Sequence, residues 1–207
     1  FMEKYQTCDK VDASLPAEPI VIFVTGGGSS FGVKSTLNGT VDLGMVSREL
    51  KEKELEKLGK HEKFLVGKDA VTIAVNKKSP LAKSGTALDT AQTARIFSGE
   101  TARFRDINGA LPNKDIVLLV RDSGAGSTEL LQEVVMKDKQ LSKRALQLPS
   151  QGALLQRLQA NDSAVAYISS GLVAQPDSGL HGIALDGVAP SNDNVINGKY
   201  KLARPLY

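Results

Sequence analysis

Residues 20–40 read IVIFVTGGGSSFGVKSTLNGT, an apolar run followed by a turn rich in Gly and Ser. The run Ile20–Val24 predicts a buried strand, and residues 32–38 predict a helix that ends at Gly39. A strand, a turn and a helix start bring unpaired backbone N–H groups and two hydroxyls to one point, where the helix dipole adds partial positive charge. This arrangement favours an anion.

The same arrangement recurs later in the chain. Residues 116–120 (IVLLV) predict a second buried strand, which leads through RDSGAGST at residues 121–128 into a helix over residues 129–136. Two such turns that face each other would enclose an anion between them.

The side chains of the second turn fit this interpretation. Arg121 follows the strand directly, so its guanidinium is expected at the sheet edge, where it could bind an oxyanion or instead pair with Asp122 or Asp42. Gly126 lets the backbone approach a ligand, and Ser127 offers a hydroxyl, although it could act only as a helix cap.

Strands and helices alternate along the rest of the chain, which predicts an α/β fold with parallel-rich sheets and sites at the carboxyl ends of strands. Asp89, Ser150 and Ser191 are predicted N-caps. Further strands are expected at residues 41–46, 64–66, 71–75, 164–168 and 183–185, and further helices at 1–10, 49–58, 89–97 and 150–159.

The composition excludes several classes of protein. The chain has 207 residues and a formal net charge of +3, from 26 basic and 23 acidic residues. This near balance, with charges alternating in sign over residues 51–63, does not fit a nucleic-acid-binding protein. No apolar run approaches the roughly 20 residues that span a bilayer. The scattered His61, His181 and Cys8 have no metal-ligand spacing, so no metal or other cofactor is expected.

Two named motifs compete for the first glycine turn. A phosphate-binding Walker loop needs a lysine directly after the second glycine, but Val33 separates Gly32 from Lys34, which turns the lysine away. Gly28-Ser29-Ser30-Phe31-Gly32 matches the nucleophile motif G-x-S-x-G, with Ser30 as the nucleophile and His181 as a possible base. A serine hydrolase therefore remains an alternative to plain anion binding.

Several stretches in the same order resemble the phosphate-binding proteins of bacterial ABC transporters, the PstS-like group of periplasmic solute-binding proteins. GGGSSFGVKSTLNGTVDLGMVSREL resembles their first anion loop, helix and following strand, and VRDSGAGST resembles their second loop. DAVTIAVNKKSPL, ARIFSGE, AVAYISSGLV and the closing IALDGVAPSNDNVINGKYKLARPLY extend the likeness over nearly the whole chain.

The resemblance implies the type II periplasmic-binding-protein fold. In this fold two α/β lobes, each with a mixed, mostly parallel sheet flanked by helices, are joined by two crossing strands and close over the ligand. Residues 1–76 and 167–207 would form lobe 1, and residues 77–166 would form lobe 2. The first strand of lobe 1 is expected to lie outside this chain.

The resemblance also assigns roles by position. Ser29 would be the hydroxyl donor of lobe 1, Arg121 the cationic clamp, and Gly126 and Ser127 donors at the second helix start. The predicted ligand-binding set is completed by the neighbours of these residues, and it reads Gly28, Ser29, Ser30, Ser47, Arg48, Arg121, Ala125, Gly126 and Ser127.

Two positions depart from the family pattern. Ser47 stands where the family often has an aspartate, and Ala125 stands where it has a serine. A carboxylate accepts the proton of hydrogen phosphate and repels fully ionised sulfate, so Ser47 weakens that discrimination. Arg48 either adds positive charge at this point or pairs with Glu49 or Asp42.

The sequence therefore predicts an extracytoplasmic, non-enzymatic protein that binds phosphate or a similar tetrahedral oxyanion and delivers it to the membrane subunits of an ABC transporter. A periplasmic location is implied by the resemblance alone, and no signal peptide is visible in this sequence. A sensory or interaction module that kept the fold with an altered or lost ligand is the alternative.

Overall fold

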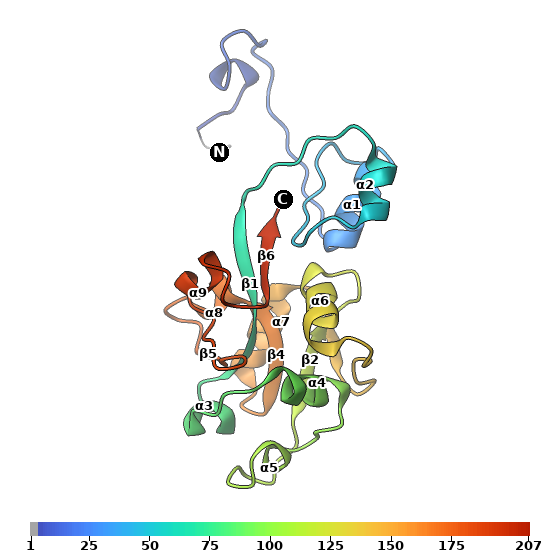
Figure 1. The fold of residues 1–207 in the computed structure, drawn as a ribbon. Coiled ribbons are helices and arrows are strands. Elements are labelled where there is room, and N and C mark those ends of the chain that lie inside the picture. The colour runs from blue at the N-terminus through green and yellow to red at the C-terminus, as the bar shows by residue number, and fades with distance from the viewer. Residues whose placement is uncertain (1–3) are drawn as a thin grey trace.

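A mixed six-stranded sheet forms the centre of the molecule, which is represented by a computed structural model that describes residues 4–207. The strand order is β3-β2-β4-β1-β5, with β6 paired to the first part of β1 (Figure 1). The strands are β1 (Gly67–Asn76), β2 (Val117–Arg121), β3 (Leu146–Leu148), β4 (Ala164–Ser169), β5 (Leu180–Gly182) and β6 (Ala203–Leu206).

The direction of the strands departs in part from the prediction. β2 is parallel to β3 and β4, as expected, but β1 is antiparallel to β4, β5 and β6. The mixed α/β fold is confirmed, whereas a mostly parallel sheet is not observed among the described residues. The boundaries of the two lobes stay a prediction.

Side chains alternate between the two faces of the sheet, and each face is covered by helices. Val165 and Tyr167 of β4 pack in one apolar cluster, whereas Ala164, Ala166 and Ile168 pack in another. The first cluster includes side chains from α4 (Thr90–Ser98), α6 (Gly126–Leu131) and the π-helical turn η2 (Gln132–Met136), and the second includes side chains from α7 (Gln151–Ala160). A short loop joins the carboxyl end of β2, at Arg121, to the start of α6, at Gly126.

The remaining helices are short. They are η1 (Cys8–Lys10), α1 (Ser29–Leu37), α2 (Glu52–Leu58), α3 (Pro80–Ser84), α5 (Phe104–Ile107), α8 (Ser170–Val173) and α9 (Asn192–Ile196). The caps predicted from sequence are confirmed, because the side chains of Asp89, Ser150 and Ser191 accept hydrogen bonds from the third residue of α4, α7 and α9.

Residues 4–66, here called the N-terminal segment, differ most from the prediction. The apolar runs 20–24, 41–46 and 64–66 are not strands, and Phe23, Leu43 and Val66 are 90%, 78% and 80% exposed. Backbone groups of Val21–Val24 have no hydrogen-bonded partner within residues 4–207, and a strand needs such a partner. The predicted helix over residues 1–10 is reduced to η1, with residues 1–3 outside the described part, and the strand expected at 183–185 lies three residues earlier, as β5.

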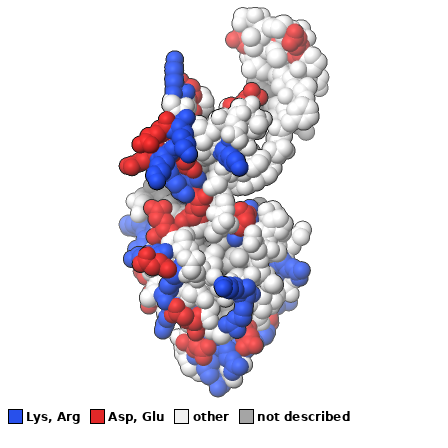
Figure 2. Space-filling model, turned by 90° about the vertical axis from the view of Figure 1, so that its right-hand side faces the viewer, with Lys and Arg blue, Asp and Glu red and all other residues white. Residues whose placement is uncertain are grey.

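The N-terminal segment stands beside the end of the sheet at which β1 begins and β6 ends (Figure 1). Val46 exchanges backbone hydrogen bonds with Tyr207, and the amide of Val66 donates to Leu206. Ser30 of α1 contacts Gly124 and, in α6, Glu129, so the two glycine loops come within reach of each other. Figure 2 shows acidic and basic side chains interspersed over one face, whereas in this view the protruding N-terminal end shows a few acidic side chains among uncharged ones.

Candidate functional site

The first glycine loop turns sharply just before α1. Gly28 has a φ of 79°, a conformation that side-chain-bearing residues rarely adopt. A Cβ atom at Gly28 would also lie 2.8 Å from the carbonyl oxygen of Gly124, so only glycine fits. This turn leaves Ser29, the first residue of α1, with only 2% of its surface exposed.

The second loop is braced by its own acidic residue. One Asp122 oxygen pairs with Arg121 Nη2 at 3.1 Å, and the other accepts a hydrogen bond from the Gly124 amide at 3.1 Å. The Arg121 side chain is 11% exposed, and its Nε–H has no partner within the described residues. Arg121 thus forms the ion pair with Asp122 that was one alternative from the sequence, and it still retains a buried donor.

Tyr167 fixes the position of this loop against the sheet. Its hydroxyl accepts a hydrogen bond from the Arg121 amide at 3.0 Å and is bonded to Thr128 Oγ1 at 2.8 Å. Burial raises the pKa of Tyr167, so the hydroxyl remains protonated and can donate to Thr128. The end of β2 and the start of α6 are therefore held together.

The two loops contact each other. The Ser30 amide donates to the Gly124 carbonyl at 3.2 Å. A Cβ atom at Gly126 would lie 2.4 Å from Ser29 Oγ and 2.6 Å from Ser47 Oγ, so these two hydroxyls directly face the start of α6. Ala125, also predicted, precedes Gly126 and is 2% exposed.

Ser29 and Ser47 form a bonded pair of hydroxyls. Their Oγ atoms are 3.1 Å apart, and the Ser47 amide donates to Ser29 Oγ at 3.0 Å. The pair therefore lies where the N-terminal segment and α6 come closest. Whether these residues bind a ligand stays a prediction, but the structure brings Gly28, Ser29, Ser47 and Gly126 together.

Arg204 and Asp69 extend this pair, and sequence reasoning missed both. Arg204 Nη1 donates to Ser47 Oγ at 3.1 Å, while its Nε and Nη2 donate to one Asp69 oxygen at 3.2 and 2.8 Å. Arg204 is 7% exposed. Ser47 and Arg204 are 157 positions apart, so no local pattern could reveal the contact. The ArgProLeuTyr ending was part of the resemblance, but no role was assigned to its arginine.

A second polar connection runs from Asp69 towards α6. Ser169 Oγ donates to Asp69 at 2.8 Å, and the Ser169 amide donates to Gln151 Oε1 at 3.2 Å. Gln151 in turn donates to Ser127 Oγ at 3.4 Å. The predicted donor Ser127 is therefore linked through buried and half-buried polar groups to the Ser29–Ser47 pair.

Glu129 of α6 binds residues of the N-terminal segment. Its carboxylate accepts a hydrogen bond from Ser30 Oγ at 2.5 Å, forms an ion pair with Arg48 Nε, and lies 3.2 Å from Lys51 Nζ. We call these three contacts the Glu129 clasp. Ser30 and Arg48 are both bonded to Glu129 in this structure. Their role in ligand binding stays a prediction.

Pairing of Arg48 with the carboxylate of Glu49 or Asp42 was one alternative from the sequence, and the structure shows a different partner. Arg48 donates to both Glu54 oxygens at 2.8 Å and to the Glu49 carbonyl at 2.9 Å. Burial opposes its charge, but the hydrogen bonds to Glu54 and the charge of Glu129 outweigh burial, so the pKa of Arg48 is raised. Arg48 lowers the pKa of Glu54 in turn, and the pair is ionised.

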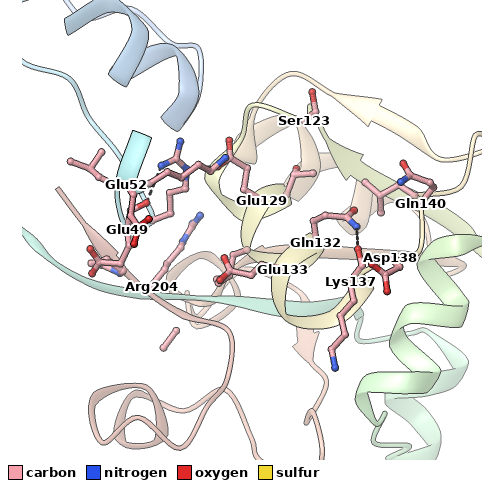
Figure 3. Close-up of a pocket in the computed structure, with 18 residues that line it drawn as sticks. Glu49, Glu52, Ser123, Glu129, Gln132, Glu133, Lys137, Asp138, Gln140 and Arg204 are labelled. Atoms are coloured by element: carbon pink, nitrogen blue, oxygen red, sulfur yellow. Dashed lines mark hydrogen bonds and ion pairs between the residues drawn. The ribbon is translucent and has the colours of Figure 1, made fainter. Parts of the chain in front are cut away.

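A cavity of about 1060 Å³ lies beside the clasp. Figure 3 shows Glu49 and Arg204 on one side of it, and Gln132, Lys137 and Gln140 on the other. Ser29, Ser47, Gly126 and Arg121 do not line this cavity, so it flanks the site at which the loops meet.

The geometry does not favour the alternative chemistries. The hydroxyl of Ser30 is bonded to Glu129, whereas His181 lies on β5, and the ring of His61 contacts the carbonyl of Gly59. Neither histidine therefore contacts the serine that a hydrolase would use. Within residues 4–207, no group of three or more His, Cys, Asp or Glu side chains is placed to hold a metal ion.

Comparison with known proteins identifies the family. A model described as "PBP superfamily domain" matches residues 3–207. The chain belongs to the PBP superfamily. It is 25% identical to the phosphate-binding protein PstS of Staphylococcus haemolyticus over 87% of its length, and 29% identical to that of Staphylococcus epidermidis, also over 87%. The chain spans 58% and 57% of these two relatives.

Solved structures support the same assignment. One is described as a phosphate ABC transporter substrate-binding protein with bound phosphate from Clostridium perfringens. It is 27% identical, with a TM-score of 0.76, over 86% of this chain and 70% of that one. An ABC-type phosphate transport receptor from Vibrio cholerae shares the fold, with 22% identity and a TM-score of 0.68 over 90% of this chain and 74% of that one.

Proposed function

We propose that this chain binds a tetrahedral oxyanion, most favourably phosphate, between the loops at residues 28–30 and 122–127. The observation that carries the proposal is the convergence of Ser29 and Ser47 on Gly126, where a Cβ atom would lie 2.4 Å from Ser29 Oγ. Two hydroxyls thus lie directly against the backbone at the start of α6. Such oriented dipoles stabilise an anion in a space from which water is excluded.

Arg121 supplies the charge in this proposal. Its guanidinium is largely buried and pairs with Asp122 at 3.1 Å, but Nε–H has no partner within residues 4–207. A buried donor without a partner is costly, and an anion would satisfy it. Charge-assisted hydrogen bonds of this kind are roughly twice as strong as neutral ones.

The remaining parts of the proposed function rest on the relatives. Their names describe phosphate-binding proteins and ABC transporter receptors, which supports delivery of the anion to an ABC transporter and an extracytoplasmic location for this chain. Within the described residues, no helix combines the length and the apolar character needed to cross a bilayer. The family is one of binding proteins, and we propose no catalytic step.

Isothermal titration calorimetry with phosphate, sulfate, molybdate and tungstate tests the proposal. Phosphate should bind the wild-type protein and raise its melting temperature. Absence of heat and of any melting shift with all four anions would reject an oxyanion-binding function.

A glycine substitution locates the site. Gly126→Ala places a methyl group against Ser29 and Ser47, so it should abolish phosphate binding. Gly26→Ala is the matched control in the first loop, because its Cβ atom would meet no atom within 4 Å. Equal phosphate affinity in the two variants would place the anion elsewhere.

Truncation of the arginine tests the charge. Arg121→Ala should weaken phosphate binding by about 2 kcal/mol or more, as expected for loss of a buried charge partner. Circular dichroism verifies that the variant is folded. Wild-type affinity in the folded variant would remove Arg121 from the site.

A further inference from the structure

The two hydroxyls of the Ser29–Ser47 pair have few donors and acceptors that are not already used in hydrogen bonds. Of their four lone pairs, one accepts from the Ser47 amide at 3.0 Å, one from Arg204 Nη1 at 3.1 Å, and one takes part in the 3.1 Å contact between the hydroxyls. One of the two hydroxyl hydrogens lies in that same contact. Whichever serine donates, the pair offers one O–H donor and one lone pair to its surroundings.

Arg204 reduces the number of lone pairs that the serine pair has free. Without its hydrogen bond, Ser47 Oγ would have a further lone pair with which to accept a proton from a ligand. The guanidinium also places positive charge beside Ser47, which disfavours a ligand O–H pointing there. Arg204 thereby makes the serine pair a poorer proton acceptor.

Asp69 cannot take over the role of proton acceptor. One of its oxygens receives Arg204 Nε and Nη2 at 3.2 and 2.8 Å, and the other receives the hydroxyls of Ser169 and Ser170 at 2.8 and 3.3 Å. Its side chain is 12% exposed. The carboxylate that Arg204 links to the serine pair therefore has its lone pairs occupied.

We propose that Arg204 is a specificity-determining residue of this site, because its hydrogen bond occupies a lone pair of Ser47 that could otherwise accept the proton of a bound anion. The proposal rests on the proposed oxyanion-binding function. A fully ionised oxyanion needs only donors, whereas hydrogen phosphate also needs an acceptor for its proton. The site should therefore bind sulfate about as well as phosphate.

The wild-type protein gives the first test, by calorimetric titration with phosphate and with sulfate in the same buffer. The two dissociation constants should agree within about tenfold, since no repulsive group acts against sulfate. A preference for phosphate of more than about 100-fold would overturn the proposal. If neither anion binds, the proposed function itself fails, which is a different outcome.

Paired substitutions test the role of Arg204. Asp69→Asn with Arg204→Met removes both buried charges together and frees a lone pair on Ser47. The ratio of phosphate affinity to sulfate affinity should then rise about tenfold or more. Arg204→Lys keeps the charge and should retain the wild-type ratio.

The ratio separates specificity from structure. A change that only disturbs folding weakens both anions equally, so an equal loss in the double variant would overturn the proposal. Thermal melts verify that each variant is folded. If the double variant does not fold, the wild-type ratio and Arg204→Lys decide: strong wild-type selection for phosphate, or a changed ratio in the lysine variant, rejects the role of Arg204.

Discussion

The Glu129 clasp predicts that one carboxylate controls how firmly the two loops stay together. Glu129 belongs to α6, whereas Ser30, Arg48 and Lys51 belong to the N-terminal segment, so every bond of the clasp spans the two sides of the site. The Glu129 and Arg48 side chains are 15% and 8% exposed. Glu129→Ala therefore leaves a nearly buried guanidinium without one of its partners.

The size of the effect follows from this burial. Removal of one partner from a buried, hydrogen-bonded charge pair costs about 2–5 kcal/mol. Arg48 keeps both bonds to Glu54, so the low end of about 2 kcal/mol applies. If that energy favours the closed form, phosphate affinity should fall roughly 30-fold.

Calorimetry and stopped-flow fluorescence of a labelled protein measure this effect as a dissociation constant and a release rate. The phosphate release rate should rise more than the association rate falls, because the clasp acts after the loops have met. Glu133→Gln is the matched control, since Glu133 is exposed and has no hydrogen bond or ion pair within the described residues. Phosphate affinity in Glu129→Ala equal to that of the control would refute the reasoning.

Three further predictions concern stability. Lys201 and Thr90 lower the pKa of Asp186 to about 2, so its contribution is present above the ordinary pKa of 3.8 and is lost as the pH falls towards 2. Asp186→Asn should therefore cost about 1 kcal/mol in urea unfolding at pH 7, and much less near pH 2; the same cost at both pH values would contradict this. Leu154→Ala, at a fully buried site, should lower the free energy of unfolding by about 3 kcal/mol in the same assay. Phe23→Ser, at a 90% exposed site, should change that energy by less than about 0.5 kcal/mol and reduce light scattering on concentration.

Local patterns predicted the elements whose partners lie within the chain. The apolar runs of β2 and β4 pair with each other, and the cap at Asp89 needs only its own helix. The run at residues 20–24 carries an equally strong strand pattern, yet it forms no strand, because no strand pairs with it within residues 4–207. Periodicity gives the preference of a segment, while pairing decides whether the strand forms.

In the candidate site, too, local features could be predicted from the sequence, whereas contacts between distant residues could not. The turn and the helix start of each glycine loop could be predicted, because both are local features, whereas the strand predicted before the first loop was wrong. The residues that support the loops could not be predicted, since Ser30 and Glu129 are 99 positions apart, and Ser47 and Arg204 are 157 apart. A buried arginine and an exposed one look alike in a sequence, and only the fold distinguishes Arg204 from its surface counterparts.

The arrangement of charges explains why hydroxyls and amides should dominate binding. Arg121 is paired with Asp122 and Arg204 with Asp69, so neither cation faces the proposed anion space without a nearby carboxylate. An anion that enters therefore meets little net positive charge, and besides the Arg121 Nε–H the decisive groups are donors already fixed in position, such as the Ser29–Ser47 pair. Fixed donors need no reorganisation when the anion arrives, whereas water would have to reorient. Selectivity therefore depends on whether the pair can also accept a proton from the anion, and the bond from Arg204 to Ser47 removes one of the lone pairs that could do so.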